Sequence, residues 1–282
     1  MSSKRHDSFN WKSRPFRARR GTQPADAERF AERMVAPQFP RAAQYDPIWV
    51  YSHSMGPNVL WLTEWLSQNI ELSAGMRILD LGCGTAVSSI FLAREFGVSV
   101  CAAELWVAPH DNWERVMEAD LASGVFPMHA EAHSLPFAHS YFDAIVSVDA
   151  YHYFGTDERY LPYVARFVRP GGTLAIVVPG NAVDPEEMPP DQRSEFFKGD
   201  AAADFFTFRS AVWWKRFWSR SGAVNSVEAR MLENGHELWL RWSDAGAAWQ
   251  GGRLEDAADA PMLLPASGRG LGFTLVIAHR PE

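Results

Sequence analysis

Cysteine and long hydrophobic runs are both scarce in this sequence. The 282 residues include two cysteines, Cys83 and Cys101, which are too few for a disulfide framework. No apolar run reaches the roughly 18 residues of a membrane-spanning helix, and Leu174–Val178 is typical of the longest ones. The polar and basic residues after Met1 lack the apolar core of a signal peptide. We therefore expect a soluble protein of the cytoplasm.

Basic residues are scarce outside the amino-terminal end. The chain has 27 Lys and Arg against 34 Asp and Glu, a formal net charge of −7. Residues 1–20 hold seven of the basic groups and one acid, which leaves 20 basic and 33 acidic groups, or −13, for the rest. Such an acidic body predicts no nucleic-acid partner. Residues 1–23 are expected to form a disordered basic tail, whose possible contacts are RNA, a membrane surface or an acidic protein.

The remaining composition is that of a globular protein, with 47% hydrophobic and 22% charged residues. From residue 76 onward, short apolar runs alternate with segments of helical periodicity, which is typical of an α/β protein with a doubly wound, mostly parallel sheet. Seven runs are expected to be strands: 76–81, 98–103, 125–129, 142–148, 172–178, 224–232 and 272–279.

The flanking segments predict helices around this sheet. Residues 24–36 and a segment beginning at Pro57 form an expected helical extension, with a loop over 45–55 between them. Residues 181–222 read as a helical insertion or lid. Six of the twelve tryptophans lie between 213 and 249, where packing in the core is favoured over an aromatic wall on a ligand pocket. One domain over residues 24–282 accounts for the length.

The most informative segment is Ile78–Gly84 (ILDLGCG), which places glycines in the turn from the first strand into the first helix. Glycine there allows a ligand to approach the backbone closely. Valine at 87 stands where a dinucleotide fingerprint needs its third glycine, and the carboxylate of Asp80 suits a cationic ligand better than a pyrophosphate.

This segment resembles the first motif of the class I S-adenosylmethionine-dependent methyltransferases, nearest the small-molecule branch typified by ubiquinone and menaquinone biosynthesis. Three further segments are similar to that family in order and spacing: Glu131–Phe137 (EAHSLPF), Phe142–Val146 and Arg169–Gly172. The resemblance implies a Rossmann-like methyltransferase fold, S-adenosylmethionine as cofactor and S-adenosylhomocysteine as product. The acceptor implied is a small molecule.

The resemblance also implies individual binding residues. Gly82 and Gly84 are expected against the methionine moiety, with Cys83 between them and Asp80 ordering the loop and the amino group. Glu104, twenty residues beyond Gly84, is expected to bind the ribose hydroxyls, with Leu105 beside it. Glu131 and Ala132 are expected near the adenine.

Methyl transfer from a sulfonium needs alignment and the exclusion of water more than a nucleophilic side chain. After the fourth expected strand, His152 is a candidate general base, and Asp149 and Tyr153 are candidates to hold the acceptor. A second candidate patch before the first expected strand contains His53, a further catalytic candidate, and Ser54, which together with Asp149 is also expected to bind the cofactor. The alternative for His152 is a hydrogen-bonded structural role, and the alternative for the second patch is a helix-entry turn with Ser54 near the cap.

Other readings are weaker. His129, His133 and His139 gather near Glu131, but their spacing matches no familiar metal motif, so no metal is expected. A non-catalytic protein that binds the cofactor, and a macromolecule methyltransferase that uses the basic tail, are the alternative functions. The acceptor atom and the oligomeric state are not readable from the sequence.

Overall fold

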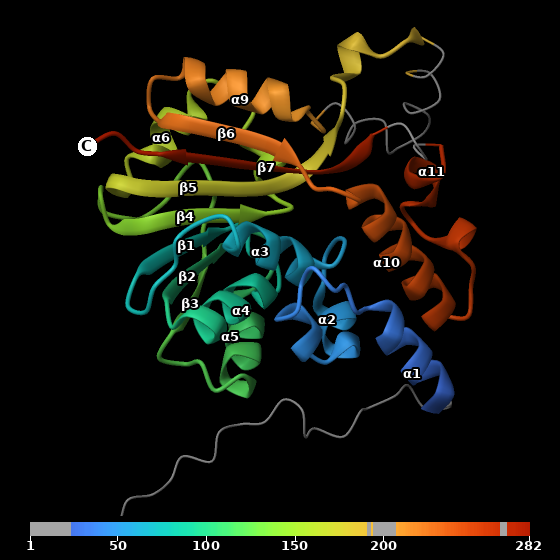
Figure 1. The fold of residues 1–282 in the computed structure, drawn as a ribbon. Helices are drawn as coiled ribbons and strands as arrows, with labels where there is room; N and C mark the ends of the chain where they lie inside the picture. Colours follow the sequence, from blue (N-terminus) through green and yellow to red (C-terminus); the bar gives the residue numbers. More distant parts are fainter. Residues whose placement is uncertain (1–23, 191–192, 194–206, 266–269) are drawn as a thin grey trace, which may run out of the picture.

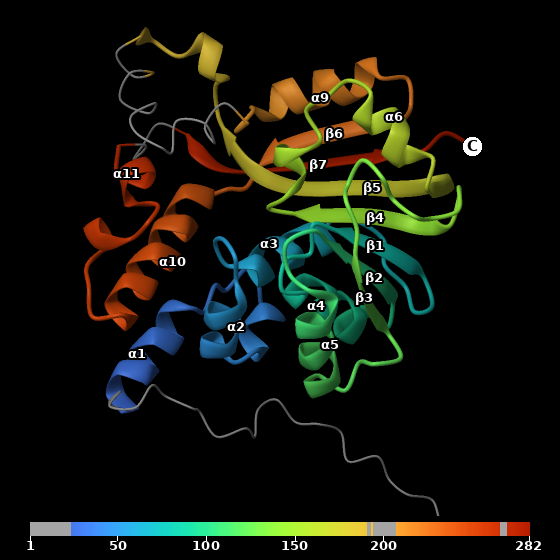
Figure 2. The same ribbon diagram turned by 180° about the vertical axis from the view of Figure 1, so that it is seen from behind.

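The computed structural model describes residues 24–190, 193, 207–265 and 270–282, and the expected basic tail lies outside them. A seven-stranded sheet with the order β3-β2-β1-β4-β5-β7-β6 forms its centre (Figures 1 and 2). The first five strands are parallel, while β7 runs antiparallel to both β5 and β6. The strands are β1 (Arg77–Leu81), β2 (Ser99–Glu104), β3 (Val125–His129), β4 (Phe142–Val148), β5 (Val168–Asn181), β6 (Asn225–Met231) and β7 (Leu271–His279). The predicted doubly wound, mostly parallel sheet is confirmed.

The sheet is buried on both faces, as a parallel sheet must be. Successive residues of β1 show this directly, because Ile78 belongs to one hydrophobic core and Leu79 to the other. Helices α6 and α9 cover one face, and α3, α4 and α5 cover the other (Figure 1). The helices are α1 (Pro24–Arg33), α2 (Pro47–His53), α3 (Val59–Ser67), α4 (Val87–Phe96), α5 (Pro109–Glu118), α6 (Tyr160–Ala165), α9 (Ala211–Arg220), α10 (Gly235–Trp249) and α11 (Ala260–Leu263).

One segment differs from its prediction. Residues 47–53 form α2, although the prolines and β-branched residues of 45–55 indicated a loop. Pro47 stands in the first turn, where its missing N–H costs nothing, and the Asp46 carboxylate accepts hydrogen bonds from Ile48 N and Trp49 N. The proline therefore begins the helix instead of preventing it.

The predicted core role of the tryptophans is confirmed for four of the six. Trp214 and Trp218 of α9 are fully buried under β6, and Trp239 and Trp242 of α10 are buried on the opposite face. Of the expected insertion over 181–222, the structure describes α9 and a short 3-10 turn at Pro185–Glu187, while residues 191–192 and 194–206 lie outside the described part. Among the described helices, none has the length and apolar character that a membrane crossing requires.

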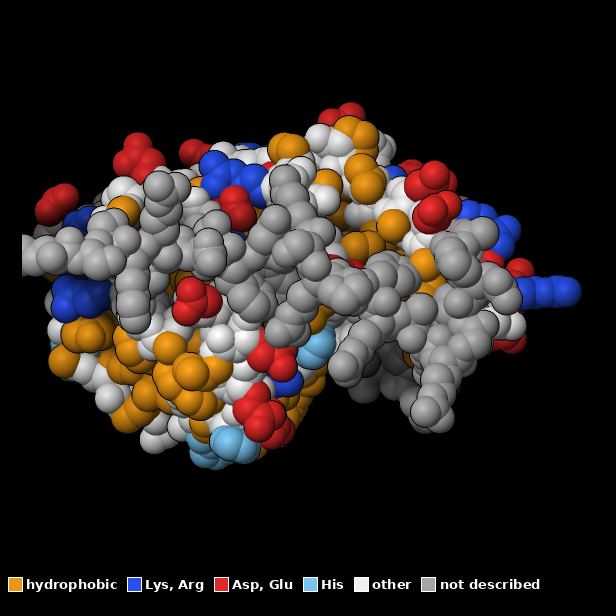
Figure 3. All heavy atoms as spheres, turned by 90° about the horizontal axis from the view of Figure 1, so that it is seen from below, with side chains coloured by type: hydrophobic (Ala, Val, Ile, Leu, Met, Phe, Trp, Pro, Cys, Tyr) orange, Lys and Arg blue, Asp and Glu red, His pale blue; other side chains and the backbone are white. Residues whose placement is uncertain are grey.

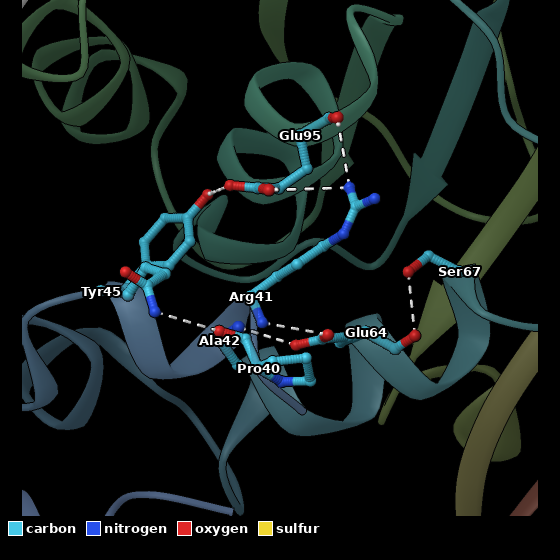
Figure 4. A network of polar contacts seen from close by, with 8 residues as sticks. Pro40, Arg41, Ala42, Tyr45, Glu64, Ser67 and Glu95 are labelled. Carbon is cyan, nitrogen blue, oxygen red and sulfur yellow. Dashed lines mark hydrogen bonds and ion pairs between the residues drawn. The ribbon is translucent and has the colours of Figure 1, made fainter. Parts of the chain in front are cut away.

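A buried carboxylate attaches the amino-terminal extension to the sheet domain (Figure 4). Glu64 of α3 is almost fully buried, and its two oxygens accept hydrogen bonds from Arg41 N at 3.1 Å and Ala42 N at 2.7 Å. Close by, the Tyr45 hydroxyl donates to Glu95 at 3.0 Å. The Ala42 contact is buried, so its N–H group depends on the Glu64 carboxylate for a hydrogen bond.

Substituting Glu64→Gln is expected to lower the free energy of unfolding by about 1 to 2 kcal/mol, because the amide keeps one acceptor and loses the other. Urea denaturation measures this change. Glu118→Gln on exposed α5 is the control and should leave the midpoint unchanged. Equal midpoints for both variants would show that the Glu64 contacts contribute nothing to stability.

Candidate functional site

A cavity of about 310 Å³ lies at the carboxyl ends of the parallel strands, where open α/β sheets bind their ligands. We call it the strand-end cavity. It is lined by the residues that follow β1, β2, β3 and β4, together with the link from α2 to α3. These lining segments are Leu81–Thr85 with Val87 and Ser88, Ala103–Trp106, Ala130–Ala132, Val148–Ala150 with Tyr153 and Phe154, and His53, Met55–Pro57 and Val59.

The glycines after β1 form one wall of this cavity. Gly82 and Gly84 have φ angles of +75° and +54°, in the left-handed region that favours glycine. A Cβ atom at Gly82 would lie 2.5 Å from Cβ of Ala150, and one at Gly84 would lie 3.0 Å from Sδ of Met55. A side chain at either position would therefore clash with these neighbours, and the bare backbone of the two glycines leaves room for the close approach of an extended ligand.

Two residues that the sequence reasoning missed hold this loop from behind. Asn112 of α5 donates from Nδ2 to the Gly84 carbonyl at 2.9 Å, and Arg115 donates from Nε to the Thr85 carbonyl at 3.0 Å. Arg115 also donates to Oδ1 of Asn112 at 2.6 Å, which fixes the amide orientation. Nothing in their spacing marks them, because they contact the loop only through the packing of α5 beside it.

Glu104 closes the opposite side of the loop at the end of β2. Its side chain is nearly buried, and its carboxylate accepts hydrogen bonds from Gly84 N and Trp106 N, each at 2.8 Å. Each oxygen keeps a further lone pair, so the carboxylate can also accept from two neighbouring hydroxyl groups. Leu105 and Trp106 line the cavity mouth and are 42% and 72% exposed. Trp106 was not predicted.

Asp80 lies behind the loop and does not line the cavity. Its Oδ2 accepts hydrogen bonds from the hydroxyls of Ser88 and Ser89, each at 2.6 Å, which ties β1 to the start of α4. Burial raises the pKa of its carboxyl group to about 6. The contacts suit the expected ordering of the loop, whereas contact with an amino group stays a prediction. Cys83 does line the cavity, and burial raises the pKa of its thiol.

Glu131 and Ala132 line the cavity beyond β3, as expected for the third part of the site. The Glu131 carboxylate accepts hydrogen bonds from the backbone N–H of His133 at 2.9 Å and from its Nδ1 at 2.8 Å. These two bonds lower the pKa of Glu131 and hold its side chain in place. Their role toward an adenine stays a prediction.

Asp149 lies at the end of β4 and lines the cavity with a φ angle of +56°. Its carboxylate accepts no hydrogen bond from the residues that the structure describes, and a Cβ atom at Gly56 would lie 2.1 Å from its Oδ2. Burial, and then the negative charge of Asp259, raise the pKa of Asp149 to about 7. The site therefore contains an available carboxyl group that can accept a proton near neutral pH.

His152 is placed differently from its prediction. It is fully buried and does not line the cavity, and neither ring nitrogen has a hydrogen-bond partner among the described residues. Burial lowers its pKa to about 3. This placement does not support His152 as general base, because a buried imidazole of this kind does not reach the cavity and its lowered pKa disfavours the binding of a proton. Tyr153, its neighbour, is 53% exposed and does line the cavity.

In the second candidate patch, too, one residue lines the cavity and the other does not. His53 lines the cavity, and its Nδ1 donates to the Trp49 carbonyl at 2.7 Å, which leaves the Nε2 lone pair available in the neutral ring. Ser54 does not line the cavity, and its hydroxyl donates to the Val50 carbonyl at the end of α2. Ser54 therefore has a structural contact here, and its binding role is not supported by this arrangement.

Comparison with known proteins agrees with this geometry. Residues 78–172 match the family described as a methyltransferase domain. Residues 78–172 therefore carry a methyltransferase domain, which confirms the resemblance to methyltransferases that the sequence predicted.

Curated relatives match about two fifths of this chain. The methyltransferase GfsG of Streptomyces halstedii is 34% identical over 41% of this chain and 42% of its own length. The 27-O-demethylrifamycin SV methyltransferase of Amycolatopsis mediterranei is 30% identical over 41% and 43%. The demethylmenaquinone methyltransferase of Mycobacterium bovis is 29% identical over 44% and 49%. The matched segment thus spans less than half the length of each of these relatives.

Solved structures extend the match in fold. Phosphoethanolamine N-methyltransferase 2 of Haemonchus contortus superposes on 90% of this chain and 60% of its own with a TM-score of 0.62 and 16% identity. Geranyl diphosphate C-methyltransferase of Streptomyces coelicolor covers 77% of this chain and 78% of its own, with a TM-score of 0.60 and 16% identity. At this identity the likeness establishes the fold of the methyltransferase domain.

Proposed function

We propose that the protein transfers a methyl group from S-adenosylmethionine to a small-molecule acceptor by in-line displacement. The observation that carries this proposal is the strand-end cavity, because three separately predicted motifs meet in it. Gly82 and Gly84 supply a bare backbone wall, Glu104 supplies a nearly buried carboxylate, and Glu131 and Ala132 line the far end. Two of the curated relatives, the 27-O-demethylrifamycin SV methyltransferase and the demethylmenaquinone methyltransferase, act on small molecules by name and support the same activity.

The residues of the cavity suit the cofactor in three ways. The glycine wall would hold the methionine part, Glu104 the two ribose hydroxyls, and Glu131 with Ala132 the adenine. When bound, the cofactor supplies a methyl group already activated on a sulfonium. The protein then has to align the acceptor, exclude water and accept any proton that the acceptor releases. Asp149, with His53 as the alternative, is proposed for that last role.

Binding of the cofactor is the first test of this function. Calorimetry is expected to show binding of S-adenosylmethionine and S-adenosylhomocysteine, and no binding of NADH, because Val87 occupies the position of the third glycine that a dinucleotide site requires. Tight binding of NADH without any response to S-adenosylhomocysteine would contradict the proposal. Formation of S-adenosylhomocysteine with a small-molecule extract then tests transfer itself.

A further inference from the structure

A second cavity, of about 550 Å³, lies beside α10 and has no role in the function proposed so far. We call it the α10 cavity. Its floor consists mainly of small residues, Gly246, Ala247, Gly251, Gly252, Ala257 and Ala258, which leave the space open. The larger groups that line it are two aromatic rings, Tyr51 and Trp242, the amide of Gln250, and two carboxylates, Asp256 and Asp259.

The α10 cavity and the strand-end cavity share one stretch of chain. Tyr51 lines the first, and its hydroxyl accepts a hydrogen bond from Gln250 Nε2 at 2.7 Å. Five residues later, Gly56 lines the second and lies against the Asp149 carboxylate. The charge of Asp259, which lines the α10 cavity, also helps to raise the pKa of Asp149, which lines the strand-end cavity. The shared stretch of chain and this effect of charge indicate that the two cavities are neighbours.

Acidic side chains line both the strand-end cavity and the α10 cavity. Among the described residues that line either cavity, none is Lys or Arg, and neither Asp149 nor Asp259 forms an ion pair. Asp259 is held in position, because its Oδ2 accepts hydrogen bonds from Trp239 Nε1 at 2.6 Å and from the Ser243 hydroxyl at 2.8 Å. Two carboxylates without a cation repel each other in a partly desolvated site, and a bound cation would relieve that repulsion.

The aromatic rings favour the same kind of ligand. The ring centroids of Tyr51 and Trp242 are 5.2 Å apart, the planes are inclined by 54°, and both residues line the α10 cavity. Aromatic rings attract organic cations, and they also pack against the apolar body that carries the charge. Anionic ligands are disfavoured by every charged side chain in the lining of this cavity.

We propose that the methyl acceptor is an amine, which binds as the ammonium ion between Asp149 and Asp259 with its body in the α10 cavity. This inference rests on the proposed methyl transfer. One ammonium proton passes to the Asp149 carboxylate, and the freed lone pair of nitrogen forms the bond to the methyl carbon. The carbon–sulfur bond breaks and its electron pair stays on sulfur, so the sulfonium charge is replaced by the charge on the methylated nitrogen.

Charge fractionation of a cell extract tests the acceptor class. A small-molecule extract is separated by ion exchange into cationic, neutral and anionic fractions, and each is incubated with the protein and methyl-labelled S-adenosylmethionine. Labelled product is expected mainly from the cationic fraction, with the methyl group on nitrogen by mass spectrometry. Label mainly from the neutral or the anionic fraction would overturn the amine, while methyl transfer itself would stand.

Thermal stability tests the acid pair without any turnover. Asparagine tolerates the left-handed conformation of residue 149, so Asp149→Asn removes the charge and keeps the backbone. Relief of the repulsion is expected to raise the melting temperature by roughly 2 to 4 °C. Asp259→Asn, which keeps one acceptor for Trp239 and Ser243, provides the second measurement and should not lower it.

Glu255→Gln is the matched control for these two variants. Glu255 is exposed in the same loop as Asp259, so its substitution removes an equal charge away from the cavity and should leave the melting temperature unchanged. A fall in melting temperature for Asp149→Asn would overturn the proposed repulsion. An extract without any labelled fraction, from a protein that still binds the cofactor, would contradict the proposed function, and the stability comparison would still decide the acid pair.

Discussion

Glu104→Ala is expected to weaken the binding of S-adenosylhomocysteine on the order of 10- to 150-fold. A hydrogen bond to a charged group contributes roughly 1.5 to 3 kcal/mol, and the nearly buried Glu104 carboxylate is placed to accept from the ribose hydroxyls. Calorimetry measures the dissociation constants, and circular dichroism establishes that the variant is folded. A folded variant with the affinity of the wild type would show that the ribose is bound elsewhere.

Glu104 also holds the backbone of Gly84 and Trp106, so part of the loss in Glu104→Ala comes from the loop. A double-mutant cycle with the 2′-deoxy form of S-adenosylhomocysteine separates the two effects. The wild type should lose affinity for the deoxy ligand, whereas Glu104→Ala should bind both ligands equally. If the deoxy ligand costs both proteins the same affinity, Glu104 acts only on the loop.

The sequence predicted the strands and the glycine turn of this site well, because these features depend on patterns within short segments. A short apolar run followed by glycines indicates a strand that turns into a helix, and the carboxyl ends of parallel strands lie at one edge of the sheet. These rules identified Gly82 and Gly84, whereas Glu104 and Glu131 were identified by the resemblance to the methyltransferase family, and all four line one cavity.

The supporting contacts could not be predicted in this way. Asn112 and Arg115 reach the glycine loop from a neighbouring helix, and no pattern in α5 distinguishes them from surface residues. Trp106 follows Glu104 directly, but its exposure at the cavity mouth depends on how the chain leaves β2. Such details arise from packing between elements, which the periodicity of a single segment does not contain.

In the segment after β4, one of two predicted residues lines the cavity and the other does not. Asp149 and His152 were both expected at the acceptor, but the positive φ of Asp149 and the 3-10 turn Tyr151–Tyr153 send their side chains to different places. Asp149 enters the cavity and His152 enters the core. A histidine is often assigned as a base because its ordinary pKa is near neutral. Here burial raises the pKa of Asp149 and lowers the pKa of His152, so Asp149 is the residue with a pKa near neutral.

Asp149→Asn is expected to lower turnover on the order of 10²- to 10⁴-fold, with little change in cofactor affinity, because the amide cannot accept the proton of the acceptor. The pKa of about 7 gives this prediction a pH dependence. A base must be deprotonated, so wild-type activity should rise as the pH increases through about 7, and this limb should disappear in the variant.

The pH dependence of stability provides an independent check of the Asp149 pKa, because stability should fall with rising pH where activity rises. The pKa of Asp149 is higher in the folded state than its ordinary value of 3.8, so the folded protein binds this proton more tightly than the unfolded chain. Its contribution to stability is present at acidic pH and is lost as the pH rises from about 4 to about 7, and Asp149→Asn should remove that loss. His53→Gln is the comparison for activity, since His53 lines the cavity and is the alternative base proposed above. Full turnover in Asp149→Asn together with a large loss in His53→Gln would transfer the role of base to His53.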